Sequence, residues 1–204
     1  MIKTLFIPAR VKSRVNSKKI TEISKQLPKE IAIAYSIQFE EVAKEIKKEL
    51  SKKHTITKLV QVLGCSNPVF PKTTKAILLI GSGRFHAVSI AQESKLPTYV
   101  LDQNNLHKIS GKEVEEIEKK KKVAYLNFLH ADEAGILIST KPGQQKLKRA
   151  INLKNKIKNK KLYFFLADNI NSLELENFKI GSWINTACPR MDMDFNFLNI
   201  RDLE

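Results

Sequence analysis

The amino-acid sequence predicts an α/β protein made of two similar small domains, each a mostly parallel sheet flanked by helices. Short apolar segments of strand length alternate with longer segments whose apolar residues recur at helical spacing. Several apolar segments run directly into loops that contain glycine, cysteine or threonine, and this pattern restarts halfway along the chain. Strands that alternate with helices form right-handed βαβ units, and such units build parallel sheets.

The first half of the sequence predicts five strands and two helices. The helix at 17–26 ends before a proline, and the helix at 40–53 carries Val42, Ile46 and Leu50 at helical spacing with charges between them. The predicted strands are 5–9, 31–35, 59–63, 76–80 and 98–101.

The second half opens with a long helix at 112–129, whose acidic residues come first and whose basic residues follow, as the helix dipole favours. We expect strands at 135–139, 161–167 and 183–185 and helices at 144–158 and 172–178. The boundary lies near 101–110, with 102–105 as a connector, so the expected domains are residues 1–103 and 104–204. Each domain sends a strand into a cysteine-bearing loop, which predicts two variants of one architecture.

Length and hydropathy place the chain among globular proteins. A hydrophobic content of 42% over 204 residues is enough for packed cores. The longest apolar runs are far shorter than the roughly 20 residues that span a bilayer. The first residues look like a strand and not like a signal peptide, so we expect a cytoplasmic protein.

The net charge of +15 comes from 36 basic and 21 acidic residues, and it favours an anionic partner. The lysine clusters at 119–122 and 154–161 lie on predicted helices and turns, where lysine is ordinarily solvated, and a compositional bias also explains them. No RNA-binding motif accompanies them, and aromatic residues are not interleaved with them. Nucleic-acid binding is therefore not expected.

Four loops follow predicted strands, at the edge where parallel sheets bind ligands. They are Gly64-Cys65-Ser66-Asn67-Pro68, Gly81-Ser82-Gly83-Arg84-Phe85-His86, Ser139-Thr140-Lys141-Pro142-Gly143-Gln144 and Asn185-Thr186-Ala187-Cys188-Pro189-Arg190. A helix that starts at Gln144 would direct free backbone N–H groups at an anion. Lone cysteines such as Cys65 and Cys188 are otherwise small buried residues, and a disulfide is not expected in a reducing compartment.

These loops, in this order, resemble those of the diphthamide-synthase family of archaeal type. The resemblance rests on 61–65, 81–86, 135–144 and 184–190, and it covers the chain from Gln61 almost to its end. It implies three similar α/β domains that each give one cysteine to a shared 4Fe-4S cluster, whose fourth iron meets S-adenosylmethionine. The cluster cleaves this substrate reductively to a 3-amino-3-carboxypropyl radical, which is added to a histidine of translation elongation factor 2. This transfer is the first step of diphthamide biosynthesis.

By this resemblance, Cys65 and Cys188 are the expected cluster ligands, since soft thiolates suit iron–sulfur clusters. Gln144 and Arg190 are the expected residues for the methionyl carboxylate, because a guanidinium pairs with a carboxylate in two hydrogen bonds and an amide can donate beside it.

Other residues near these loops have plainer interpretations. His86 caps or fills a turn. Lys141 is a solvated loop residue. Asp168 caps the short helix that follows it, and Trp183 belongs to the core.

The family's first domain, with its own cysteine loop, has no counterpart in this sequence. We therefore expect a separately encoded chain to supply the third cysteine, together with an electron donor and a possible homo- or hetero-oligomer. Two alternatives stay open: a non-catalytic paralogue or partner subunit that supports a catalytic subunit, and a basic RNA-binding module. The presence of both cysteine loops and Gln144 favours the catalytic reading.

Overall fold

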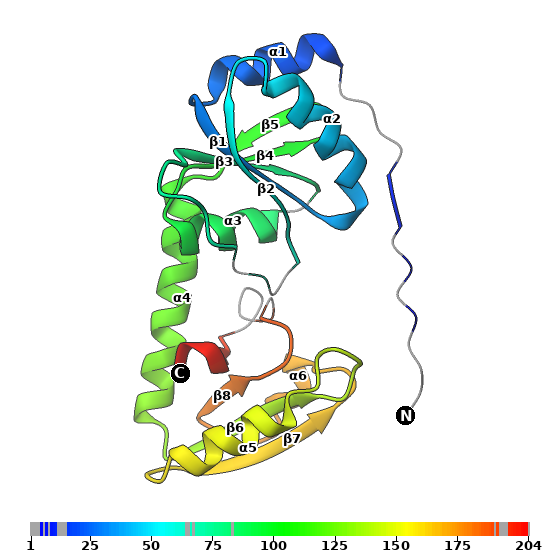
Figure 1. Ribbon diagram of the computed structural model, residues 1–204. Helices are drawn as coiled ribbons and strands as arrows, with labels where there is room; N and C mark the ends of the chain where they lie inside the picture. The colour runs from blue at the N-terminus through cyan, green and yellow to red at the C-terminus, as the bar shows by residue number, and fades with distance from the viewer. Residues whose placement is uncertain are drawn as a thin grey trace. The chain divides into compact units, whose positions relative to one another are not determined.

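The computed structural model describes residues 5, 7, 9–11, 16–63, 66, 68–82, 84–189, 191 and 196–203. The chain divides into two compact units, Met1–Val114 and Glu115–Glu204. Each unit contains one sheet with helices packed on it, as Figure 1 shows. Among the described helices, none is both long and apolar enough to cross a membrane.

The first unit contains a five-stranded sheet in the order β2-β1-β3-β4-β5. Its first four strands are parallel, and β5 pairs antiparallel with β4. The strands are β1 (Glu30–Tyr35), β2 (Thr55–Gln61), β3 (Ala76–Ile80), β4 (Thr98–Asp102) and β5 (Asn105–Lys108). The helices are α1 (Ser17–Gln26), η1 (Ile37–Phe39), α2 (Glu40–Leu50) and α3 (Arg84–Ser94).

Alternation along the strands determines which helices cover each face of this sheet. Ile31 and Ile33 of β1 pack in one cluster with apolar residues of α1 and α2, among them Ile46. The intervening alanines of β1 face the other way. Figure 1 shows α3 on the side of the sheet away from α1 and α2, and its Ile90 is buried. Both faces are therefore covered, as a parallel sheet requires.

The second unit contains a four-stranded, all-parallel sheet in the order β7-β6-β8-β9. The strands are β6 (Glu133–Ser139), β7 (Lys161–Ala167), β8 (Ser182–Asn185) and β9 (Leu198–Asn199). The helices are α4 (Gly111–His130), whose first four residues belong to the first unit, α5 (Leu147–Lys156), α6 (Ser172–Leu175) and η2 (Ile200–Leu203). Phe128 of α4, Leu153 of α5 and Ile200 of η2 pack in one cluster with Ile136 of β6.

The first four strands of each unit follow the same spatial order: second, first, third, fourth. The predicted fold class, two similar units with mostly parallel sheets flanked by helices, is confirmed. In both units the second strand lies on one side of the first strand, and the third strand lies on its other side. The carboxyl edge beside the first strand is therefore a switch point, where open α/β sheets bind ligands.

Several expectations differ from the structure. The strand expected at 59–63 lies at 55–61, as β2. The segment 102–105, expected as an interdomain connector, is the turn between β4 and β5, with Gln103 in the left-handed region (φ 54°), and the division between units falls at Val114 instead of 103. The helix expected from Gln144 begins at Leu147. The strand expected at 5–9 lies partly outside the described residues, and those described there have no assigned regular structure.

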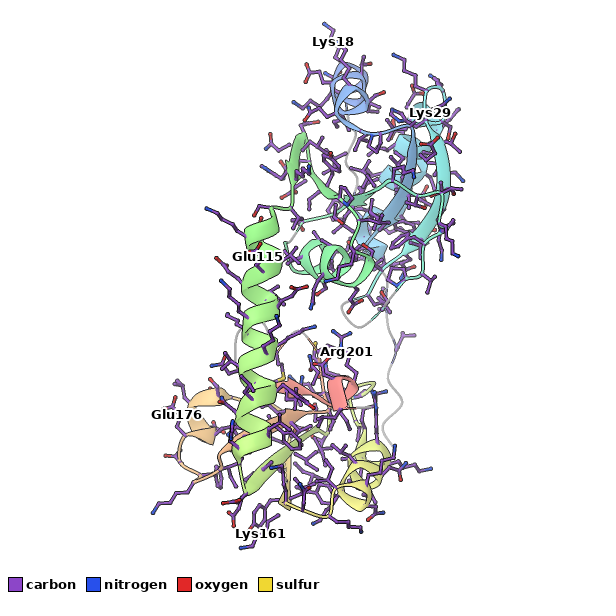
Figure 2. The ribbon with its side chains drawn as sticks, turned by 90° about the vertical axis from the view of Figure 1, so that its left-hand side faces the viewer. Lys18, Lys29, Glu115, Lys161, Glu176 and Arg201 are labelled. Carbon is purple, nitrogen blue, oxygen red and sulfur yellow. The ribbon has the colours of Figure 1, made fainter. Side chains whose placement is uncertain are left out.

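Basic side chains project from both units, as expected for a chain with 36 basic and 21 acidic residues. Figure 2 shows Lys18 and Lys29 projecting from the first unit and Lys161 projecting from the second. Some of this charge is paired: a hydrogen bond from Lys44 lowers the pKa of Glu40, and a hydrogen bond to Glu133 raises the pKa of Lys161. These pairs are exposed, so they contribute little to stability.

Candidate functional site at the carboxyl ends of the second sheet

Three loops of the second unit meet where β6, β7 and β8 end. The Thr140 N–H, just after β6, donates to the carbonyl of Ala167 at 3.1 Å, and the Thr140 hydroxyl donates to the Asp168 carboxylate. On the other side, the Thr186 N–H and hydroxyl both donate to the carbonyl of Leu137, at 3.1 and 2.7 Å. The loops that follow all three strands are therefore joined at one edge of the sheet.

Cys188 lies in the loop after β8, as predicted, and its thiol is free and half-buried. The loop is held by Asn185, the last residue of β8, whose amide donates to the Cys188 carbonyl at 2.8 Å. The side-chain oxygen of Asn185, Oδ1, accepts a hydrogen bond from the Ala187 N–H at 2.9 Å. This side chain thus forms a turn around its own backbone, a common use of asparagine.

A second asparagine supports this loop from the neighbouring strand. Asn199 of β9 lies beside Asn185 in the sheet register, and the Asn185 amide donates to its side-chain oxygen at 2.8 Å. The Asn199 amide reaches the Pro189 carbonyl at 3.4 Å. Sequence reasoning assigned neither asparagine a role. A polar residue that closes an apolar strand three positions before a cysteine was the available signal for Asn185.

Gln144 lies at the same edge, but not at the start of a helix. Its N–H donates to the Lys141 carbonyl at 3.0 Å, and Gly143 between them has φ 79°. A proline followed by a glycine of positive φ, closed by this hydrogen bond, is a type II turn. The expected anion site made of free N–H groups at Gln144 is therefore wrong, because that N–H is used in the turn. Its half-buried side chain remains the group that can bind a ligand.

Cys65 and Arg190, the other two predicted site residues, lie outside the described residues. Near Cys65, the Leu63 N–H donates to Ser66 Oγ at 2.8 Å, and the Ser66 hydroxyl donates back to the Leu63 carbonyl at 2.9 Å. The two cysteine loops follow different strands of the shared order. Cys65 follows β2, the second strand of its unit, whereas Cys188 follows β8, the third.

The plainer interpretations have mixed outcomes. Trp183, expected in the core, is half-buried and packs edge-on against Phe165, with ring centroids 4.8 Å apart. The expectation for Asp168 is wrong: Asn171 caps α6 by accepting from the Leu173 N–H, while Asp168 accepts from Thr140. His86 is half-buried in the first turn of α3, and Lys141 is exposed.

The donor atoms determine what this chain can offer a metal centre. A free thiol at the open edge of a sheet suits iron or an iron–sulfur cluster. Among the described residues, no group of three or more His, Cys, Asp or Glu side chains gathers to hold a metal ion. The whole sequence has two cysteines, so it can supply at most two thiolate ligands. The residues can therefore supply some, but not all, of the thiolate ligands of an iron–sulfur cluster.

The two parallel-sheet units and the Cys188 loop identify the class of protein. It is an α/β protein with a cysteine in the loop that follows a parallel strand. The model of the family described as "Putative diphthamide synthesis protein" matches residues 1–198. The chain belongs to the diphthamide synthesis protein family.

Named relatives and solved structures agree with this membership. A 2-(3-amino-3-carboxypropyl)histidine synthase of Methanocaldococcus jannaschii is 30% identical over 208 residues, which cover 95% of this chain and 57% of that protein. The Pyrococcus horikoshii protein of the same name is 27% identical, over 66% of this chain and 40% of its own length. Subunit 1 of the Schizosaccharomyces pombe synthase is 32% identical, over 67% of this chain and 33% of its own length.

The crystal structure of Dph2 from Pyrococcus horikoshii has the same fold, with a TM-score of 0.76 over 92% of this chain and 59% of that one, at 24% identity. The structure of that protein with a 4Fe-4S cluster matches equally well, at 25% identity. The chain spans at most 59% of the length of these proteins.

Proposed function

We propose that this chain takes part in the first step of diphthamide biosynthesis, as a 3-amino-3-carboxypropyl transferase of the radical S-adenosylmethionine type. The group would pass from S-adenosylmethionine to a histidine of translation elongation factor 2. Family membership and the names of the relatives support this reaction. The observation that carries the proposal is the free Cys188 thiol at the carboxyl edge of a sheet whose fold matches a protein solved with a 4Fe-4S cluster.

In this proposal Cys65 and Cys188 are thiolate ligands of a 4Fe-4S cluster. When bound, the cluster supplies the electron that breaks a carbon–sulfur bond of the sulfonium substrate. Cysteine binds iron as the deprotonated thiolate. The residues of this chain would hold the cluster and orient the substrate beside it.

Gln144 and Arg190 are proposed to bind the methionyl carboxylate of S-adenosylmethionine. The type II turn at 141–144 places the Gln144 side chain on the loop joined to the Cys188 loop through β6. Its amide can donate one hydrogen bond, while an arginine can donate two in parallel. Both groups are neutral or positive, which suits an anionic group on the substrate.

In this proposal a third cysteine comes from outside these 204 residues, because the sequence holds two. We propose that a separate chain supplies it and that an electron donor completes the system. The naming of several relatives as subunit 1 of the synthase supports assembly with another chain. The second candidate is a non-catalytic partner that supports a catalytic synthase subunit, and a count of two cysteines is compatible with it.

Iron binding tests the ligand assignment directly. After anaerobic reconstitution together with the partner chain, Cys65→Ala and Cys188→Ala should each lose most of the bound iron and the charge-transfer absorption of the cluster. Ser51→Ala, at the exposed end of α2 and outside both cysteine loops, is the control, and it should retain the iron. If either cysteine variant kept its full iron content, that cysteine would not be a ligand.

A further inference from the structure

The backbone that carries Cys188 is tied to the sheet by a buried pair of asparagines. Asn185 and Asn199 are 2% and 3% exposed. The Asn185 side chain makes three hydrogen bonds of 2.8 to 2.9 Å: to the Cys188 carbonyl, to Asn199, and from the Ala187 N–H. It therefore fixes the backbone on both sides of the Ala187–Cys188 peptide.

The Cys188 carbonyl accepts two hydrogen bonds. It accepts from the Asn185 amide at 2.8 Å and from the Met191 N–H at 3.1 Å. The next carbonyl, that of Pro189, accepts from Asn199. Because both carbonyls are engaged by the sheet side of the loop, the backbone torsions that direct the Cys188 side chain are restricted.

Ending the strand does not require Asn185. Thr186 already joins the end of β8 to β6 through two hydrogen bonds to the Leu137 carbonyl, and neither touches Cys188. Burying two primary amides is costly unless every polar atom is paired, and an apolar pair would fill the same space without that cost. Among the described residues, each buried side-chain polar atom does have a partner. A fully paired, buried amide network defines one local conformation.

We propose that Asn185, supported by Asn199, is the positioning residue of Cys188. It holds the cysteine in one backbone conformation, so that the thiolate meets a metal atom with little rearrangement. That this conformation serves iron binding rests on the proposed function. The restriction of the Cys188 backbone by Asn185 does not depend on iron and can be tested in this chain alone.

The test uses thiol reactivity without any cluster. A Cys65→Ser background leaves Cys188 as the single thiol, since the sequence has two cysteines. In that background, Asn185→Ser keeps an oxygen that can accept from the Ala187 N–H but loses the reach to the Cys188 carbonyl. Thr186→Val is the matched control: it is equally buried, also loses a hydrogen bond, and leaves the Cys188 peptide untouched.

The rate of alkylation by iodoacetamide is then measured at increasing low concentrations of urea. We expect Asn185→Ser to raise the rate about fivefold or more, because the hydrogen bonds to the Cys188 carbonyl and to Asn199 are both lost and each is worth about 1 kcal/mol. This increase should hardly depend on urea, because a local opening exposes little surface. Thr186→Val should accelerate alkylation only by increasing the population of globally unfolded molecules. Its effect should therefore depend steeply on the urea concentration.

Asn199→Ser removes the hydrogen bond that supports Asn185, and it should give a smaller, urea-independent increase in the alkylation rate. If Asn185→Ser does not fold, Asn199→Ser is measured in its place. An unchanged rate in Asn185→Ser, or an increase that follows urea as in Thr186→Val, would overturn the inference. Loss of iron binding by the parent chain would count against the proposed function and would not alter this result.

Discussion

Gly135 of β6 shows how a single residue constrains the second unit. A Cβ atom at this position would lie 2.2 Å from Cζ3 and 2.4 Å from Cε3 of Trp183, the neighbouring residue on β8. The indole is held in place by Phe165, with ring centroids 4.8 Å apart. Phe165 is itself packed edge-on against Phe178. An added Cβ atom would therefore displace the indole from its edge-on contact with Phe165.

Gly135→Ala should lower the free energy of unfolding by about 1 to 3 kcal/mol, the usual cost of overpacking. Urea denaturation followed by the fluorescence of Trp183, the single tryptophan of the chain, reports this change. Gly111→Ala is the control, because a Cβ there meets nothing within 4 Å. Equal stability of the two variants would show that the indole can move aside.

At the scale of elements, His54 links α1 to the sheet of the first unit. Its Nδ1 lies 2.8 Å from the Pro28 carbonyl, and its Nε2 lies 2.8 Å from the Ser24 hydroxyl. Ser24 belongs to α1, and His54 directly precedes β2. The ring donates from Nδ1 to the Pro28 carbonyl, because that oxygen can only accept, and Nε2 shares a hydrogen bond with the Ser24 hydroxyl. Together these contacts fix how α1 ends against the sheet.

His54→Ala should lower the free energy of unfolding by about 1 to 3 kcal/mol, because two half-buried hydrogen bonds lose a partner. Amide hydrogen exchange should also accelerate in α1 more than in β3. His107→Ala, on the exposed strand β5, should leave both quantities unchanged. Unaltered exchange in α1 of the His54 variant would mean that apolar packing alone holds this helix.

Elements that bury apolar residues could be predicted from the sequence, and elements made by tertiary pairing could not. The strands 76–80 and 161–167 were predicted with the bounds of β3 and β7. β5 was missed because its residues are mostly exposed and only its pairing with β4 makes it a strand. The start of α5 was misplaced because the proline–glycine turn at 142–143 was taken as a helix entry.

At the scale of the whole molecule, both units repeat one strand order and carry loops at the same edge of their sheets. The sequence was sufficient to place Cys188 in a loop after a parallel strand. It was not sufficient for the asparagine pair, because Asn199 joins Asn185 only through the register of β8 and β9. Residues that act on a site from a neighbouring strand leave no local pattern in the sequence.

The central claim is that this chain contributes two of three protein thiolates to a histidine-modifying enzyme. The most direct measurement is the mass of the target histidine peptide of elongation factor 2 after anaerobic incubation with S-adenosylmethionine and a reductant. With a partner chain that supplies the third cysteine, we predict gain of one 3-amino-3-carboxypropyl group, and none when the partner is omitted or Cys188 is replaced by alanine. Full modification by the 204 residues alone would contradict the claim, and no modification by the complete complex would identify a non-catalytic partner instead.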